Sequence, residues 1–117
     1  MRVISGKARG TKIYTLDENI TRPTLDRVKE SIFNIIQPKV EDSIFLDLFA
    51  GSGAIGIEAA SRGAEKVILC DKSKEAIGVI NKNLDKTHLK EKAEVHNIDY
   101  LTCLNNLKEK KQKIDII

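Results

Sequence analysis

The feature that most constrains the fold is a glycine-rich segment, residues 47–56, which reads Asp-Leu-Phe-Ala-Gly-Ser-Gly-Ala-Ile-Gly. A short, nearly all-apolar run precedes this segment, and a run of small residues with helical character follows it. The glycines at positions 51, 53 and 56 form a G-x-G-x-x-G pattern, in which residues 51–53 are expected to make a tight turn between a strand and a helix. Glycine lets the backbone pass close beneath a ligand, and the start of a helix offers free N–H groups. The segment thus predicts a ligand-binding turn.

From residue 43 onward the chain alternates between apolar runs and helical patterns. Strands are predicted at residues 44–48, 66–70, 94–97 and from 114, and helices at residues 54–62, 74–86 and around 101–107. Near-continuous apolar strands separated by helices are typical of a parallel sheet that is covered on both faces. We therefore predict an α/β fold, a Rossmann-like doubly wound parallel sheet of about four strands, with ligands at the carboxyl ends of the strands.

Residues 1–42 show a different pattern and are predicted to form a unit distinct from residues 43–117. Two short β-prone stretches within residues 2–16, punctuated by glycines, predict a small hairpin or a loose arm. A polar connector leads into a predicted helix over residues 24–36, which Pro38 is expected to stop. The apolar residues at helical spacing in this helix are Leu25, Val28, Ile32 and Ile35.

The N-terminal segment is also basic. Residues 1–16 carry four basic and no acidic side chains, whereas the net charge of the whole chain is +3. Lys7, Arg9 and Lys12 on a hairpin would suit an RNA backbone, because contacts to phosphate position a protein on RNA. A solubilising edge strand explains the same charges. Arg22 and Arg27, around the start of the helix, could face phosphate or a cofactor carboxylate, or could be solvated beside acidic neighbours.

Three acidic residues, Asp47, Asp71 and Asp99, stand at the ends of the first three predicted strands. Asp71 follows Gly51 by 20 residues, the position at which an NAD-binding protein keeps the carboxylate that binds its ribose. An NAD-dependent oxidoreductase is therefore one alternative. Asp47 argues against it, because a carboxylate beside the pyrophosphate of a dinucleotide is repulsive.

S-adenosylmethionine fits the three carboxylates better than NAD does. Its methionine part carries an ammonium group and a sulfonium cation, which Asp47 would attract. Asp71 would accept hydrogen bonds from the ribose hydroxyls, and Asp99 from the adenine amino group. Each aspartate taken alone is more often a helix cap or a solvated loop residue than a ligand-binding group. The prediction of S-adenosylmethionine therefore depends on the three residues together.

The same residues carry a resemblance to a known family. The segment from residue 47 to 53, with Ile57-Glu58-Ala59 and Ser61-Arg62-Gly63-Ala64, resembles the nucleoside-binding motif of the RsmD-type 16S rRNA guanine-N2 methyltransferases. Residues 21–24 (Thr-Arg-Pro-Thr), 26–28 (Asp-Arg-Val), 30–31 (Glu-Ser) and 33–34 (Phe-Asn) resemble the upstream helix of that family, and residues 4–10 resemble its basic hairpin. The resemblance covers essentially the whole chain, and its upstream part is the most specific.

The resemblance implies a class I methyltransferase that uses S-adenosylmethionine to methylate the exocyclic N2 of a guanine in 16S rRNA. The implied partner is 16S rRNA or an assembly intermediate of the small subunit. The implied cofactor-binding residues are Arg22, Asp47, Phe49, Ala50, Gly51, Ser52, Gly53, Asp71, Lys72 and Asp99. The implied RNA-binding residues are Lys7, Arg9, Lys12 and Arg27.

The family performs its chemistry with an Asx-Pro-Pro-aromatic motif at the end of the fourth strand. The only prolines here are Pro23 and Pro38, so the motif is absent and no residue is predicted to be catalytic. The sheet of this class has seven strands. We therefore expect a fragment that binds cofactor, is inactive on its own, and exposes a fourth-strand edge through which it could self-associate.

Composition adds few constraints. Cys70 and Cys103 form no CxxC pair, and with His88 and His96 they lack the spacing of a zinc site, so no metal is expected. Cys70 lies in an apolar run and is predicted to be a buried thiol. No signal peptide or transmembrane stretch is recognised, so a cytoplasmic location without membrane contact is expected. A non-catalytic nucleotide- or RNA-binding module remains the main alternative function.

Overall fold

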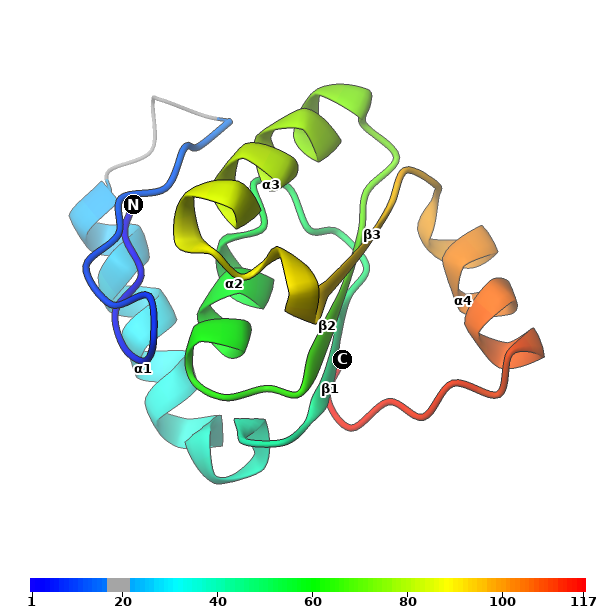
Figure 1. Ribbon diagram of the computed structural model, residues 1–117, viewed down its shortest axis with the longest axis horizontal. Helices are drawn as coiled ribbons and strands as arrows, with labels where there is room; N and C mark the ends of the chain where they lie inside the picture. The colour runs from blue at the N-terminus through cyan, green and yellow to red at the C-terminus, as the bar shows by residue number, and fades with distance from the viewer. Residues whose placement is uncertain (17–21) are drawn as a thin grey trace.

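The computed structural model describes residues 1–16 and 22–117, with the side chains of the first helix described from residue 25 onward (Figure 1). The predicted connector before this helix therefore lies almost entirely outside the described residues. The elements are α1 (Arg22–Val40), β1 (Ile44–Asp47), α2 (Ala54–Ser61), β2 (Lys66–Cys70), α3 (Lys74–Thr87), a short 3-10 turn (Lys90–Lys92), β3 (Ala93–His96) and α4 (Tyr100–Glu109). The predicted α/β class is confirmed.

The three strands form one parallel sheet in the order β1-β2-β3. Leu46 on β1 is in register with Ile68 on β2, which is in register with Glu94 on β3. Ile116 forms a parallel bridge with Phe45 on the free side of β1. The prediction of about four strands is wrong by one within the part of the chain that the structure describes. Pairing is confined to this one bridge, in which the amide of Ile116 donates to the carbonyl of Ile44 at 3.3 Å and the amide of Leu46 donates to the carbonyl of Ile116 at 2.8 Å.

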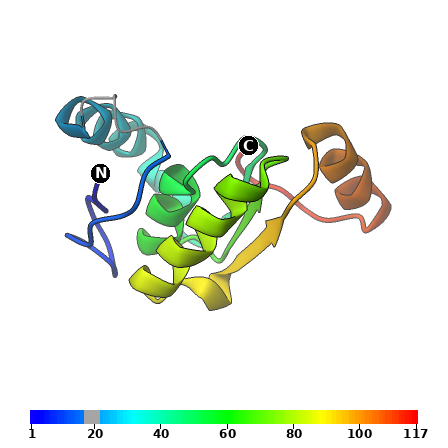
Figure 2. The ribbon, with the colours of Figure 1, turned by 90° about the horizontal axis from the view of Figure 1, so that it is seen from above.

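The two faces of the sheet have separate cores. Figure 2 shows α2 and α3 on one side of the sheet and α4 on the other. Alternate strand residues such as Val67 and Leu69 pack with α2 and α3, whereas Ile68 and Cys70 pack with α4. The parallel sheet covered on both faces follows from these all-apolar strands.

Helix α1 is longer than predicted and turns a different face inward. It runs to Val40 with Pro38 inside its last turn, so Pro38 does not stop it. Two apolar stripes exist on this helix, and spacing alone does not choose between them. The stripe of Phe33 and Val40 is fully buried, whereas Ile32 and Ile35 are exposed.

The N-terminal arm, which we define as residues 1–16, is docked on the core. It closes on itself through an antiparallel bridge between Arg2 and Lys12. Val3, Ala8 and Ile13 are buried in the same cluster as the α2 and α3 side chains. The arm is therefore a held hairpin-like segment and not a loose one. The proposed division of the chain after residue 42 stays a prediction.

Candidate functional site

The site begins at the end of β1, where the glycine turn (residues 48–53) leads into α2. Gly51 and Gly53 have φ values of 57° and 84°, a conformation that other residues rarely adopt. The amide of Gly53 donates to the carbonyl of Ala50 at 2.8 Å and closes the turn. A Cβ on Gly56 would lie 2.1 Å from Cδ2 of Leu69, so this glycine lets α2 pack directly on β2. Gly51 and Gly53 therefore form the predicted tight turn, and Gly56 lies inside α2 as a packing residue. The contact of these glycines with a ligand stays a prediction.

Asp71 links the end of β2 to this turn. Its Oδ2 accepts a hydrogen bond from the amide of Gly51 at 2.9 Å, and its Oδ1 accepts one from the amide of Ser73 at 2.8 Å. Ser73, and not Asp71, caps α3, because its hydroxyl accepts from the amide of Ala76 at 3.2 Å. Each carboxylate oxygen has a second lone pair, so Asp71 keeps accepting capacity for a ligand.

Asp47 lies at the last position of β1 and is partly buried. Burial raises the pKa of its carboxyl above the ordinary value, and the nearby negative charge of Asp71 raises it further. The amide of Phe49 opposes this shift by donating to Oδ1 at 3.1 Å. Two carboxylates at one partly desolvated edge favour a bound cation, since a positive charge there relieves both burial and repulsion.

Asp99 has a clear local role as the N-cap of α4. Its carboxylate accepts from the amide of Thr102 at 2.8 Å and from the hydroxyl of Thr102 at 2.9 Å. These hydrogen bonds lower the pKa of Asp99, with the amide of Thr102 as the largest cause. The helix-cap interpretation of this residue is therefore confirmed, and its contact with an adenine stays a prediction.

A cavity of about 340 Å³ lies at this end of the sheet, next to the turn. It is lined by Leu48, Phe49, Asp71, Lys72, Asp99 and Tyr100. The ring centroids of Phe49 and Tyr100 lie 5.4 Å apart, and the ring planes form an angle of 37°. The exposed fraction is 71% for Phe49 and 48% for Tyr100. Its size is at the lower end of the range for small-molecule sites, and two carboxylates with two open aromatic rings suit a flat, hydrogen-bonding ligand.

The structure thus brings four of the predicted cofactor residues, Phe49, Asp71, Lys72 and Asp99, to one cavity. Asp47 and residues 50–53 form the turn beside it. Sequence reasoning missed Tyr100, whose signal was an aromatic residue directly after a strand-end aspartate. The side chain of Arg22 lies outside the described residues.

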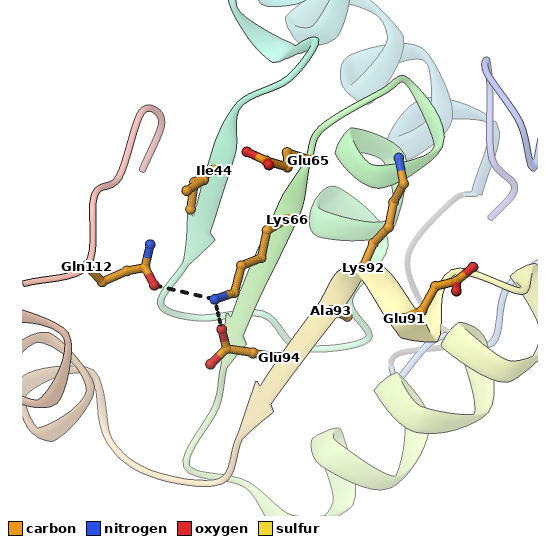
Figure 3. Close-up of a pocket in the computed structure, with 8 residues that line it drawn as sticks. All are labelled: Ile44, Glu65, Lys66, Glu91, Lys92, Ala93, Glu94 and Gln112. Atoms are coloured by element: carbon orange, nitrogen blue, oxygen red, sulfur yellow. Dashed lines mark hydrogen bonds and ion pairs between the residues drawn. The ribbon is translucent and has the colours of Figure 1, made fainter. Parts of the chain in front are cut away.

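A second hollow, of about 290 Å³, lies at the opposite, amino ends of the strands (Figure 3). Lys66 there is paired with Glu94 and donates to the side-chain carbonyl of Gln112 at 3.3 Å. Lys92 donates to the carbonyl of Ala64 at 3.0 Å. Because these cations are satisfied within the chain and no glycine turn opens onto them, this hollow is not the candidate site.

The basic residues of the arm are exposed, as a role on RNA requires. Lys7, Arg9 and Lys12 face solvent, and none of them makes an ion pair within the described residues. Arg27 on α1 is likewise exposed. Their contact with RNA stays a prediction.

Further findings concern thiols, metals and membranes. Cys70 is buried as predicted, and burial together with the neighbouring Cys103 raises the pKa of its thiol to about 12. Among residues 1–16 and 22–117, no group of three acidic, histidine or cysteine side chains is arranged to hold a metal ion. No helix in the same ranges has the length and apolar character needed to cross a membrane.

Comparison with known proteins identifies relatives of this chain. The family described as "Conserved hypothetical protein 95" matches residues 1–117. Ribosomal RNA small subunit methyltransferase D of Haemophilus influenzae is 43% identical over 105 residues, which are 89% of this chain and 54% of that protein. YlbH of Bacillus subtilis (strain 168) is 48% identical over 99 residues, 85% of this chain and 54% of that protein. The chain therefore spans about half the length of these relatives.

Solved structures agree with the fold. The Thermus protein TTHA0928 superposes with a TM-score of 0.84 at 31% identity, over 97% of this chain and 64% of that one. An Agrobacterium tumefaciens methyltransferase described as SAM dependent has a TM-score of 0.67 at 24% identity, covering 82% of this chain and 31% of that one, and shows the fold alone. The predicted resemblance to the RsmD-type family is confirmed by the relatives named methyltransferase D.

Proposed function

The chain belongs to the family described as conserved hypothetical protein 95, and from this premise we propose that it is the cofactor-binding part of an S-adenosylmethionine-dependent rRNA methyltransferase. The observation that carries the proposal is the glycine turn tied by Asp71 at the edge of a cavity, with Asp47 beside it. The name of the Haemophilus influenzae relative supports the rRNA methyltransferase class.

The residues around the cavity suit the parts of this cofactor. Asp71 would accept hydrogen bonds from ribose hydroxyls with the lone pairs that Gly51 and Ser73 leave free. Asp47 would lie near the cationic methionine part, where a positive charge stabilises its partly buried carboxylate. Phe49 and Tyr100 would flank the adenine, with Asp99 at its edge and Lys72 at the rim. S-adenosylmethionine supplies the methyl group of the reaction.

The finer parts of the proposal are the acceptor and the RNA contact. We propose the exocyclic N2 of a guanine in 16S rRNA as acceptor, on the strength of the RsmD-type motifs in the sequence. Lys7, Arg9, Lys12 and Arg27 would contact phosphates, since all four are exposed cations. Such contacts position an RNA backbone without reading its sequence.

These 117 residues contain only Pro23 and Pro38, so they hold no Asx-Pro-Pro-aromatic segment to orient a guanine amino group. We therefore propose that the chain alone binds cofactor without transferring methyl groups. Incubation of the chain with tritiated S-adenosylmethionine and 16S rRNA should leave the RNA unlabelled. Labelled RNA above the level of a protein-free control would contradict this part.

We also propose that the chain self-associates through the outer edge of the sheet, where Phe45 of β1 forms a single bridge with Ile116. Ile117 beside it is 74% exposed, and an unpaired strand edge is a template for another chain. Sedimentation velocity should show a concentration-dependent dimer fraction. A purely monomeric profile at high concentration would contradict it.

The cofactor role is tested by Asp71→Ala. Losing the charge-assisted hydrogen bonds to the ribose should weaken binding of S-adenosylhomocysteine by about 1.5–3 kcal/mol. Asp85→Ala is the matched control, because it removes the same charge from the exposed face of α3. Equal affinities for both variants and the unaltered chain would show that Asp71 only shapes the turn and does not hold the ribose.

A further inference from the structure

Asn83 is a buried amide on α3 whose hydrogen bonds join two distant segments. Its exposed fraction is 0%. Its Oδ1 accepts from the amide of Tyr14 at 2.7 Å, and its Nδ2 donates to the carbonyl of Tyr14 at 2.9 Å. The same Nδ2 donates to the carbonyl of Ser52 at 2.9 Å. One side chain therefore connects the N-terminal arm, at Tyr14, with the glycine turn, at Ser52.

The contact with the turn fixes a peptide plane. The peptide between Ser52 and Gly53 has its carbonyl held by Asn83 and its N–H held by the carbonyl of Ala50 at 2.8 Å. Gly53 has no side chain and a φ of 84°, so rotation of this peptide meets no steric barrier at Gly53 itself. Without Asn83, the Ser52 carbonyl would lose the buried donor that sets its direction.

Two neighbours on α3 reinforce the same junction. Ile80 lies one turn before Asn83, and its Cγ1 would be 3.3 Å from a Cβ on Gly53, so it packs beneath the turn. Lys86 lies one turn after Asn83, and its Nζ is 4.9 Å from the ring centroid of Tyr14. The ammonium over this ring holds the arm on the same helix that supports the turn. Figure 1 shows the arm extending along α1 toward α3.

We infer that Asn83 is a positioning residue that couples the N-terminal arm to the cofactor turn. It keeps the Ser52–Gly53 peptide in the orientation that leaves the turn open for a ligand. It does so only while the arm is docked, because the backbone N–H and carbonyl of Tyr14 bind the amide of Asn83 and hold it in place. The inference rests on the proposed function for its ligand. Its consequence is reciprocal: a cofactor bound at the turn stabilises the docked arm, and the docked arm strengthens cofactor binding.

The experiment compares Asn83→Ala, Asn83→Asp and the control Thr87→Ala by calorimetric titration with S-adenosylhomocysteine. Asn83→Ala should weaken binding about tenfold, because it leaves the Ser52 carbonyl without its buried donor. Thr87→Ala also alters a buried position of α3, but among the described residues the hydroxyl of Thr87 bonds only within α3, to the carbonyls of Asn83 and Leu84 at 2.8 and 3.3 Å. It should lower the melting temperature and change the affinity by less than about twofold.

Amide hydrogen exchange distinguishes a positioning role of Asn83 from a purely structural one. Asn83→Asp keeps an acceptor for the Tyr14 amide but loses the donor to the carbonyls of Tyr14 and Ser52. Exchange at Tyr14 should therefore stay slow in Asn83→Asp and become fast in Asn83→Ala, while both variants bind the ligand weakly. In the unaltered chain, ligand should slow exchange at Tyr14 further, and in Asn83→Ala it should not.

The outcomes separate the two proposals. If the unaltered chain binds no S-adenosylhomocysteine, the proposed function fails, and the Asn83 inference is judged without ligand by exchange at the Gly53 amide. Faster exchange at Gly53 in both Asn83 variants, but not in Thr87→Ala, supports the inference. Unchanged exchange at Gly53, or equal loss of affinity in Thr87→Ala, overturns it.

Discussion

The two faces of the sheet differ in how completely the described residues cover them. On the face of α2 and α3, the arm and α1 add a second layer, and strand residues such as Val67 and Leu69 are fully buried. On the face of α4 the core cluster is smaller, and Lys66 and Glu94 have side chains about one third exposed. The cavity of the candidate site is lined by residues that follow β1 and β2 and by Asp99 and Tyr100 at the start of α4, so both faces contribute to it. The turn that leads into α2 packs on the larger core cluster through Ala50.

Glu58 is a fully buried carboxylate on the face of α2 and α3. Its carboxylate is 0% exposed and accepts from the amides of Ile4 and Ser5 at 2.9 and 3.1 Å. It also pairs with Lys29 at 3.2 Å and with Arg62 at 2.7 Å. One side chain of α2 thus joins the arm and α1 to the helix that begins at the glycine turn. No buried carboxylate with four partners is described on the other face.

The largest expected effect is that of Glu58→Gln. The substitution leaves the buried cations of Lys29 and Arg62 without their counter-charge, which should lower the free energy of unfolding by about 3–5 kcal/mol. Urea denaturation measures this loss. Glu75→Gln, at an exposed position of α3, is the control and should change stability by less than about 0.5 kcal/mol. A loss below about 1 kcal/mol for Glu58→Gln would mean that the network is not a support of this face.

A matched pair of leucines tests the comparison directly. Leu84 on α3 is 1% exposed in the larger cluster, and Leu107 on α4 is 9% exposed in the smaller one. Leu84→Ala should cost about 4 kcal/mol of unfolding free energy and Leu107→Ala about 2, because a less enclosed site leaves a smaller cavity. Thermal and urea unfolding of both variants provide the values. Equal losses would show that both faces are packed alike.

The smallest effect concerns pH and the second face. Lys66, followed by His96, lowers the pKa of Glu94, whereas burial opposes the shift. A carboxyl whose pKa is lowered by folding contributes stability above its unfolded pKa, and this contribution is lost as the pH falls through the folded value. Both partners of the Lys66 pair are about one third exposed, so screening keeps the contribution under about 1 kcal/mol.

Glu94→Gln should therefore lower stability at neutral pH by less than about 1 kcal/mol and have little effect in the acid range, so that the decline of stability toward acid pH becomes flatter. Unfolding curves at several pH values and two salt concentrations measure this difference. A steeper decline in the variant than in the unaltered chain would have the wrong sign for this account.

Much of the fold follows from local pattern. The apolar runs place β2 at its observed bounds, Ser73 predicts the start of α3, and positive φ at Gly51 and Gly53 agrees with the glycine motif. The site was also partly predictable, because parallel strands bring their carboxyl ends to one edge and with them Asp71 and Asp99.

The remainder depends on tertiary contacts that no local pattern contains. The inward face of α1 is set by buried partners of Lys29 and Phe33, and a lysine in that stripe looks solvent-facing in sequence. Glu58 and Asn83 gave no signal for their contacts with the arm, since the arm residues that Glu58 binds lie 53 or more residues away in the chain and Tyr14 lies 69 residues from Asn83. The fourth strand was predicted from apolar residues alone, whereas a strand also needs a ladder of partners, and Ile116 forms only one bridge.

Calorimetric titration of the chain with S-adenosylhomocysteine, with NAD as the control ligand, tests the central claim most directly. The carboxylates of Asp47 and Asp71 beside the glycine turn should attract the ammonium group on the homocysteine part of the first ligand and repel the pyrophosphate of the second. We expect saturable binding of S-adenosylhomocysteine and none of NAD. Binding of NAD alone would contradict it.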